Sequence, residues 1–227
     1  MKNKTTAEQH FDKHAENYDH HKEVNWYYYK NLKSIPLKYL PNIKKHSVLE
    51  VGCGTGQIIA SLSPKYGVGT DISRNMIDIA NKKYRSKKLK FFVDNIENLK
   101  LNEKFDYIIM TDVVEHLTDF GKAAKNLKKC MHKGSKALIT TPSPLWSPVM
   151  ELAEKLKLKF EEGPHRWTSL KEMEKVLKSN GFKVLKLDTA LLLPKNIPKI
   201  SDKINETFGK IPIIRKCGLI QVVVATI

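Results

Sequence analysis

The chain has 227 residues, 41% of them hydrophobic and 28% charged, which indicates a globular domain with a buried core and excludes a disordered chain. No apolar run approaches the roughly 18 residues that a membrane span needs, and the first residues lack the apolar segment of a signal peptide. The net charge of +16 favours contact with anionic surfaces, whereas three cysteines without a C-x-x-C pair argue against a disulfide framework or zinc knuckle and favour a cytoplasmic protein.

The first forty residues are rich in aromatic side chains and predict two helices. Their patterns cover residues 5–18 and 22–40. Pro36 and Pro41 are expected to close the second helix, because proline lacks the backbone N–H of a continuing helix.

From residue 46 to 141, apolar strand-like runs alternate with helical patterns. The strand-like runs are "SVLEVG", "YGVGTDI", "LKFFVDN", "FDYIIMTDVV" and "SKALITTP". Between them lie the helical patterns "SRNMIDIANKKY", for which Ser73 is the expected N-cap, and "FGKAAKNLKKCMHKG", for which Gly134 is the expected C-cap. Alternation of this kind predicts an α/β fold with a parallel sheet covered by helices on both faces.

After residue 141 the pattern changes. "VMELAEKLKLKF" places apolar residues on one helical face, namely Val149, Leu152, Ala153 and Leu156. "TSLKEMEKVLKSNGFKVLKLDTALLL" predicts a capped helix, a glycine turn and a strand, and "GLIQVVVATI" predicts a last strand. The amphipathic stretch "KISDKINETFGKIP" lies in the connection between these two strands.

The stretch "SVLEVGCGTGQ" carries glycine at every second position, at Gly52, Gly54 and Gly56, after the acid Glu50. Glycines after a first strand allow a tight turn and a close approach of the backbone to a ligand. The spacing differs from the dinucleotide pattern G-x-G-x-x-G, which argues against a dehydrogenase. Alone, the glycines fit an ordinary strand-to-helix turn equally well.

Polar residues follow the next three strands. Asp71 ends the second strand, where an acid can accept hydrogen bonds from ribose hydroxyls, although it could also only cap the next helix. Asp94 and Asn95 follow the third strand, where a nucleoside base would lie, although a polar turn explains them as well. His116 follows the fourth strand and suits proton transfer, although a histidine that only shapes the loop is an equal alternative.

Together these features resemble the class I S-adenosylmethionine-dependent methyltransferases. "VLEVGCGTG", "VDNIENL", "FDYIIMTDVVEHL" and "HRWTSLKEMEKVLKSNGF" look like the small-molecule (type 11) branch that includes the ubiquinone and menaquinone biosynthesis enzymes, and "FDKHAENYD" is similar to the opening of that branch. The resemblance implies a Rossmann-like seven-stranded, mostly parallel sheet with a reversed last strand. It also implies one domain over 1–227, divided into a helical cap (1–45), a cofactor-binding core (46–141), a substrate-side insertion (142–167) and a C-terminal helix with strands (168–227).

The resemblance also implies S-adenosyl-L-methionine as the cofactor, S-adenosyl-L-homocysteine as its product, and roles for single residues. The implied contacts are Gly52, Cys53, Gly54 and Gly56, with Glu50 before them, at the methionine part; Asp71 at the ribose; Ile72, Met76, Asp94, Asn95 and Ile96 around the adenine; Thr111 near the sulfonium; and Tyr18 closing over the cofactor. For catalysis it implies His116, with His165 as a second candidate because family members place that segment over the substrate.

The implied activity is methyl transfer to an oxygen or carbon of a small-molecule or lipid-like acceptor, without a metal. His10 and His14 have metal-like spacing on a helix, but no acidic or cysteine partner falls in place. An RNA methyltransferase is an alternative that the charge suggests, but no Asn/Asp-Pro-Pro-aromatic segment follows the fourth strand. A cofactor-binding regulatory protein without turnover is the other alternative.

The lysine-rich amphipathic stretches within 145–160 and 199–216 leave the role of the charge open. Their usual meaning is a helix packed on the core with a solvated face. They could instead cover an apolar acceptor and rest on an anionic membrane, with the lysines of 155 to 159 taking part. A merely solvated lysine surface ranks first among these interpretations, a lipid surface second and RNA third.

Overall fold

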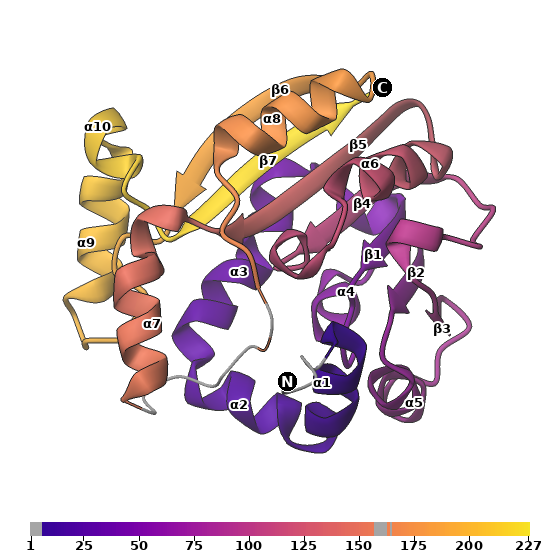
Figure 1. Cartoon of the computed structure of the whole chain (residues 1–227), viewed down its shortest axis with the longest axis horizontal. Coiled ribbons are helices and arrows are strands. Elements are labelled where there is room, and N and C mark those ends of the chain that lie inside the picture. The colour runs from indigo at the N-terminus through magenta and orange to yellow at the C-terminus, as the bar shows by residue number, and fades with distance from the viewer. Residues whose placement is uncertain (1–5, 157–162, 164) are drawn as a thin grey trace, which may run out of the picture.

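The computed structural model describes residues 6–156, 163 and 165–227, which contain one seven-stranded sheet in the order β3-β2-β1-β4-β5-β7-β6 (Figure 1). Six strands run in one direction, and β7 is antiparallel to both of its neighbours. The strands are β1 (Ser47–Val51), β2 (Tyr66–Asp71), β3 (Leu89–Val93), β4 (Phe105–Thr111), β5 (Met131–Pro142), β6 (Lys183–Ala190) and β7 (Ile220–Thr226). The predicted Rossmann-like fold with a reversed last strand is confirmed.

Ten α-helices and six short 3-10 helices surround the sheet in the described residues. The α-helices are α1 (Ala7–His14), α2 (Tyr18–Val24), α3 (Trp26–Tyr39), α4 (Gln57–Leu62), α5 (Arg74–Lys83), α6 (Phe120–Lys129), α7 (Ser147–Lys155), α8 (Leu170–Ser179), α9 (Ser201–Thr207) and α10 (Pro212–Arg215). The 3-10 helices are η1 (Ala15–Asn17), η2 (Ile43–Lys45), η3 (Ile96–Asn98), η4 (Val114–His116), η5 (Pro144–Trp146) and η6 (Phe208–Lys210).

The central strands are buried on both faces because successive side chains of a strand point to opposite sides. In β1, Val48 joins one hydrophobic cluster, and Leu49 joins the other. The first cluster contains apolar side chains of α3, α4 and α5, whereas the second contains those of α6 and α8. The sheet therefore separates two cores, and its carboxyl edge is left for a ligand.

The N-terminal segment differs from the prediction at two places. Helical structure breaks into α1 and α2 around the 3-10 turn η1, and a second break at Asn25 separates α2 from α3. Helix α3 ends at Tyr39, within one residue of the predicted end at 40, but the closing role expected of Pro36 is wrong, because the helix continues through this proline. Pro36 is buried beside Leu32 and Ile35, so tertiary packing offsets the missing backbone hydrogen bond. The first residue of the predicted helix 5–18 lies outside the described residues.

The predicted helix caps have different outcomes. Ser73 is the N-cap of α5, and its hydroxyl accepts a hydrogen bond from Met76 N at 3.2 Å. Gly134 is not the C-cap of α6, because that helix ends at Lys129 and Gly134 lies within β5. Pairing of β5 with β4 begins at Met131, so sheet formation ends the helix earlier than the local pattern predicts.

Helices α7, α9 and α10 stand together on one side of the molecule (Figure 1). Helix α7 begins two residues before the predicted stretch 149–160 and runs to Lys155, and residues 157–160 of that stretch lie outside the described residues. The capped helix, the glycine turn at Gly181 and β6 follow as expected. Within the described part of the chain, no helix has both the length and the apolar character to cross a bilayer.

Candidate functional site

A cavity of about 590 Å³ lies at the carboxyl ends of β1, β2 and β4. The strand order reverses between β1 and β4, and open α/β sheets bind their ligands at such a point. The floor of the cavity is formed by the ends of these strands, and residues of α1, α2, α3 and α7 line its other sides. One continuous space therefore joins the glycine loop to the polar loop after β4.

The glycine loop needs glycine at the two positions that line the cavity. Gly52 and Gly54 have φ angles of 69° and 51°, which side chains rarely adopt. A Cβ at Gly52 would lie 2.2 Å from a methyl carbon of Val113, and a Cβ at Gly54 would lie 3.0 Å from Tyr18 Cε1. The missing side chains therefore allow Val113 and Tyr18 to pack directly against the backbone of the loop.

Asp71 connects the glycine loop to helix α5. Its Oδ2 accepts a hydrogen bond from Gly54 N at 2.7 Å, and its Oδ1 accepts one from Ser73 N at 2.9 Å. Burial raises the pKa of Asp71, while these two backbone hydrogen bonds act in the opposite direction. Each carboxylate oxygen has a second lone pair, so the group can still accept from a ligand in the cavity it lines.

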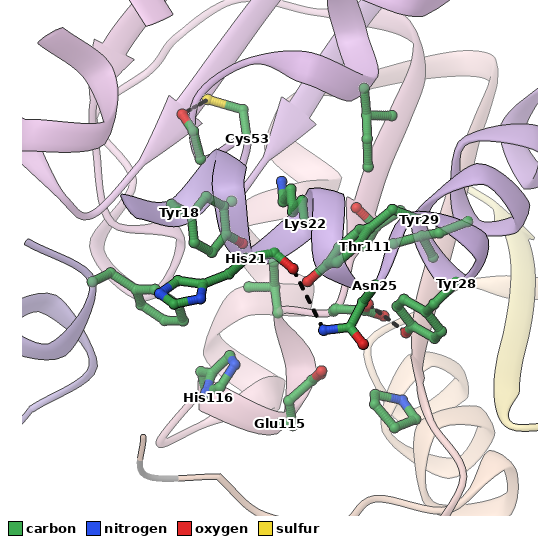
Figure 2. A pocket seen from close by; sticks show the side chains of 18 of the residues that line it. Tyr18, His21, Lys22, Asn25, Tyr28, Tyr29, Cys53, Thr111, Glu115 and His116 are labelled. Carbon is green, nitrogen blue, oxygen red and sulfur yellow. Dashed lines mark hydrogen bonds between the residues drawn. The ribbon is translucent and has the colours of Figure 1, made fainter. Parts of the chain in front are cut away.

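Lys22 lies in the centre of the cavity, between Tyr18 and Tyr29 (Figure 2). Its side chain is buried, and its ammonium lies 4.3 Å from the ring centre of Tyr18 and 5.3 Å from that of Tyr29. Burial lowers the pKa of Lys22 to about 8, whereas the negative charges of Glu50 and Asp71 act to raise it. The cavity thus contains a built-in cation next to two acids.

Glu50 and Cys53 also line the floor of the cavity. Burial raises the pKa of Glu50 to about 8, although the hydrogen bond that its Oε2 accepts from Ile59 N at 3.0 Å acts to lower it. Burial also raises the pKa of the Cys53 thiol well above its usual value, which keeps it protonated and unreactive near neutral pH. Cys53 therefore supplies no negative charge that could balance Lys22.

Two aspartates hold the N-terminal helices over the cavity. Asp12 of α1 accepts hydrogen bonds from Ser73 Oγ at 2.5 Å and from Asn75 N at 3.2 Å, at the start of α5. Asp19 of α2 accepts from Thr55 Oγ1 at 2.5 Å and from Gln57 Nε2 at 2.7 Å, next to the glycine loop, and it pairs with Lys83. These contacts join the helical segment to the sheet domain.

The far end of the cavity carries acids and histidines (Figure 2). Asp112 has a φ of 54° and accepts hydrogen bonds from Tyr28 Oη at 2.6 Å and from Thr140 Oγ1 at 3.2 Å. Glu115 is buried and accepts from Thr141 Oγ1 at 2.8 Å. His116 follows it in the same 3-10 turn and packs edge-on against Phe11 of α1. Groups that can accept a proton therefore face the space opposite the glycine loop.

The structure brings thirteen of the fifteen predicted site residues to this one cavity. They are Tyr18, Glu50, Gly52, Cys53, Gly54, Asp71, Ile72, Met76, Asp94, Asn95, Ile96, Thr111 and His116. Asp94 also accepts hydrogen bonds of 2.9 to 3.2 Å from the backbone N–H groups of Asn95, Lys100 and Leu101, so it has the turn-forming function that the sequence left open.

Gly56 and His165 are the two predicted residues that do not line the cavity. Gly56 has a φ of 78°, and a Cβ there would lie 2.7 Å from Phe91 Cε1, so this glycine serves the packing of the loop. His165 Nδ1 lies 3.0 Å from Gly163 O, and its ring packs edge-on against Trp167. The catalytic role of His165 therefore stays a prediction.

The sequence analysis missed Lys22 and the two aspartates Asp12 and Asp19. One signal for Lys22 was present, because it follows Tyr18 by four positions and so lies on the same helical face. No local pattern marks Asp12 or Asp19, whose partners lie 36 to 64 positions away in the chain.

Residues 18–187 match the family model described as a methyltransferase domain. An uncharacterized protein of Methanocaldococcus jannaschii is 30% identical over 203 residues, which cover 88% of this chain and 93% of that protein. The ubiquinone biosynthesis O-methyltransferase of Pelagibacter ubique is 32% identical over 66% of each chain.

The malonyl-[acyl-carrier protein] O-methyltransferase of Bacillus cereus is 31% identical over 56% of this chain, and the match spans only about half of that relative, 49% of its length. Among solved structures, an S-adenosylmethionine-dependent methyltransferase of Thermotoga maritima superposes with a TM-score of 0.75. That comparison covers 97% of this chain and 99% of the other at 20% identity, and it shows a shared fold.

Proposed function

We propose that this chain, which belongs to the family of class I S-adenosylmethionine-dependent methyltransferases, transfers the methyl group to an oxygen of a small-molecule or lipid-like acceptor. The family establishes S-adenosyl-L-methionine as the cofactor. The observation that carries the proposal is the position of Glu115 and His116, which face the end of the cavity opposite the glycine loop. An acceptor hydroxyl bound there would have a proton acceptor at hand.

The residues of the cavity fit the cofactor. Gly52 and Gly54 line the cavity, where a ligand could approach the backbone of the loop. The buried carboxylate of Asp71 can accept from ribose hydroxyls. An apolar wall suited to a nucleoside base lies beside it, formed by Ile72, Met76 and Ile96.

The charges of the cavity suit the methionine end of the cofactor, which carries a carboxylate and an ammonium. Lys22 is the residue that would pair with the carboxylate, and Glu50 the one that would pair with the ammonium. Tyr18 would cover this end from the helical segment, and Thr111 would lie nearer the sulfonium. The electrostatic attraction between Lys22 and Glu50 would then be replaced by contacts of each residue with the ligand.

When bound, the cofactor supplies a methyl group that is already activated on a positively charged sulfur. The protein then has to align the acceptor, exclude water and take up one proton. His116 is the proposed proton acceptor, because imidazole suits proton transfer near neutral pH. The backbone oxygen of Glu115 accepts from Arg166 N at 2.7 Å, which helps to fix the turn that carries His116.

The acceptor end has an apolar side as well as a polar one. Trp146, Val149 and Met150 line it from the start of α7, opposite the aromatic residues of α3. Such a wall suits an apolar or aromatic acceptor. Two of the relatives, the malonyl-[acyl-carrier protein] and ubiquinone biosynthesis enzymes, are O-methyltransferases, which supports oxygen as the methylated atom.

Incubation of the protein with methyl-labelled cofactor and a cell extract tests the proposal. Mass spectrometry of separated fractions should find the label in an organic-soluble small molecule or lipid, as the methyl group of a methyl ester or a methyl ether. Label confined to RNA, or no label transfer by protein that binds the cofactor, would contradict it.

The variant His116→Ala tests the proton acceptor. Turnover should fall by about 10²- to 10⁴-fold while cofactor binding is kept. His20→Ala is the matched control, because His20 lies on the helical segment with an exposed side chain. A loss below about threefold would remove His116 from this role and leave alignment as the main contribution.

A further inference from the structure

Helix α7 exposes its apolar face to solvent. Leu145, Val149, Leu152 and Leu156 are spaced four, three and four positions apart, and between 55% and 67% of each is exposed. No residue of α7 is buried. An amphipathic helix of a soluble protein normally turns this face to the core, so the exposed face indicates a partner surface.

A second apolar segment lies beside α7. Within residues 197–213, large exposed side chains recur at Ile200 and Phe208, and Ile213 is the most exposed at 79%. The indole N–H of Trp146, next to α7, donates to Cys217 O at 2.8 Å, just after α10. This hydrogen bond joins the two segments into one face, hereafter the apolar face (residues 145–156 and 197–213), which Figure 1 shows on the side of α7, α9 and α10.

The mouth of the acceptor cavity opens on the same face. Val149 is exposed on α7 and also lines the cavity, and Lys195 lines it from just before the second segment. Val24 and Trp26, at the junction of α2 and α3, are both exposed and line it as well. A molecule that covers the apolar face would therefore cover the entrance to the site.

The charge around the second segment is positive. Residues 191–217 contain six basic and two acidic side chains, a net charge of +4. Five of the basic side chains are exposed lysines: Lys195, Lys199, Lys203, Lys210 and Lys216. Exposed lysines beside exposed aliphatic side chains are typical of segments that lie in the headgroup region of an anionic bilayer.

We propose that the apolar face docks on an anionic lipid bilayer and presents the mouth of the acceptor cavity to the membrane surface. A second copy of the chain suits this face less well, because each copy carries +16 and the two would repel. An acidic carrier protein would satisfy the lysines but would leave the aliphatic stripe of α7 without an apolar partner. The inference goes beyond the proposed methyl transfer, and binding can be measured without cofactor or acceptor.

Vesicle co-sedimentation of the full chain tests the docking. Vesicles of phosphatidylcholine with about 25% phosphatidylglycerol should pellet the protein at about 50 mM salt and release most of it at about 500 mM. Vesicles of phosphatidylcholine alone should bind the protein weakly at both salt concentrations. Equal binding to the two compositions, or none to either, would overturn the proposal and leave the methyltransferase assignment intact.

Two sets of variants locate the surface. The double variant Leu152→Gln with Ile213→Gln should lower partitioning of the protein onto the anionic vesicles about tenfold or more. The double variant Lys199→Gln with Lys203→Gln should lower it on the order of twentyfold, because each lysine adds about 1 kcal/mol and 1.4 kcal/mol is a tenfold change. All four side chains are exposed, so folding should be unaffected. Thermal unfolding checks this point.

Matched controls carry the same changes elsewhere. Leu185→Gln with Leu187→Gln removes two exposed leucines of β6, and Lys87→Gln with Lys88→Gln removes two exposed lysines before β3. These variants should bind vesicles as the unmodified protein does. Equal losses in the controls would overturn the proposed location, and a dimer in ultracentrifugation that Leu152→Gln dissociates would replace the bilayer with a second copy.

Discussion

Buried charge governs the chemistry of single residues in the cavity. Lys22, Glu50 and Asp71 are all buried, and burial penalises the charged form of each. Their opposite charges offset part of this penalty, so each depends on the others. A ligand with both a carboxylate and an ammonium can replace these mutual contacts, which makes the site selective for such a ligand.

Asp71→Ala should weaken binding of S-adenosylhomocysteine by about ten- to a hundredfold. Hydrogen bonds to an ionised group contribute roughly 1.5–3 kcal/mol, and 1.4 kcal/mol is a tenfold change in affinity. Calorimetry measures the affinity, and the exposed Asp78→Ala on α5 is the matched control. An unchanged dissociation constant in a folded Asp71→Ala protein would show that this carboxylate does not hold the ribose.

The affinity for S-adenosylhomocysteine should fall as the pH rises above about 8. The pKa of Lys22 is lowered to about 8, so the ammonium that would pair with the ligand carboxylate is present below this pH and lost above it. Lys22→Met should bind more weakly at pH 7 and lose this pH dependence. Titration calorimetry from about pH 6.5 to 9.5 measures both proteins.

Two controls separate Lys22 from its neighbours. Glu50 has a raised pKa of about 8 and gains charge over the same range, and its negative charge raises the pKa of Lys22, so Glu50→Gln should keep the fall but move it to lower pH if Lys22 causes it. 5′-Methylthioadenosine lacks the amino-acid end of the cofactor, and its affinity should not respond to Lys22→Met. A pH dependence that persists in Lys22→Met would assign the effect to another group.

At the scale of elements, the helical segment before β1 acts as a cover fastened at two points. Asp12 binds the start of α5, and Asp19 binds the residues that follow the glycine loop. Both sets of aspartate contacts are polar and partly exposed, so breaking them costs less free energy than opening a packed apolar core. A ligand enclosed below α2 must wait for such opening before it can leave.

Asp19→Asn should increase the dissociation rate of S-adenosylhomocysteine by about five- to tenfold. The substitution removes the charge that pairs with Lys83 and weakens the hydrogen bonds from Thr55 and Gln57. Stopped-flow release measures the rate, and hydrogen exchange in residues 18–24 should become faster. Glu16→Gln is the matched control, because Glu16 is exposed on the same segment, and equal rates in both variants would argue against a fastening role.

At the scale of the whole molecule, one polar cluster joins three distant parts of the chain. Tyr39 at the end of α3 donates to Asp188 of β6 at 2.5 Å, and Arg215 of α10 pairs with the same carboxylate. Burial and the hydrogen bond to Asp188 raise the pKa of Tyr39, which keeps the phenol protonated as a donor. The cluster thus holds the N-terminal helices and the last helices against the far edge of the sheet.

Asp188→Asn should lower the free energy of unfolding by about 2 kcal/mol. Breaking a buried ion pair costs about 3–5 kcal/mol, and the partial exposure of the Arg215 side chain reduces this figure. Urea unfolding measures the change, with Asp78→Asn as the exposed control. A loss below about 0.5 kcal/mol would show that the pair adds little to stability.

The sequence by itself determined the parallel sheet and the position of the glycine loop, and its resemblance to a methyltransferase family indicated most of the predicted residues that line the cavity. Strand runs such as residues 47–51 and the acids that end them are local signals, and parallel strands bring their carboxyl ends to one edge. Thirteen predicted residues could therefore meet in one cavity although they are spread from Tyr18 to His116.

Only the tertiary structure decided which side chains are buried and what faces them. Lys22 is an ordinary lysine in the sequence and becomes a buried cation because β1 and β2 place Glu50 and Asp71 near it. The apolar stripe of α7 predicts a packed helix, yet the fold leaves it in solvent at the mouth of the cavity. Local pattern sets the shape of an element, whereas burial depends on neighbours that lie far away along the chain.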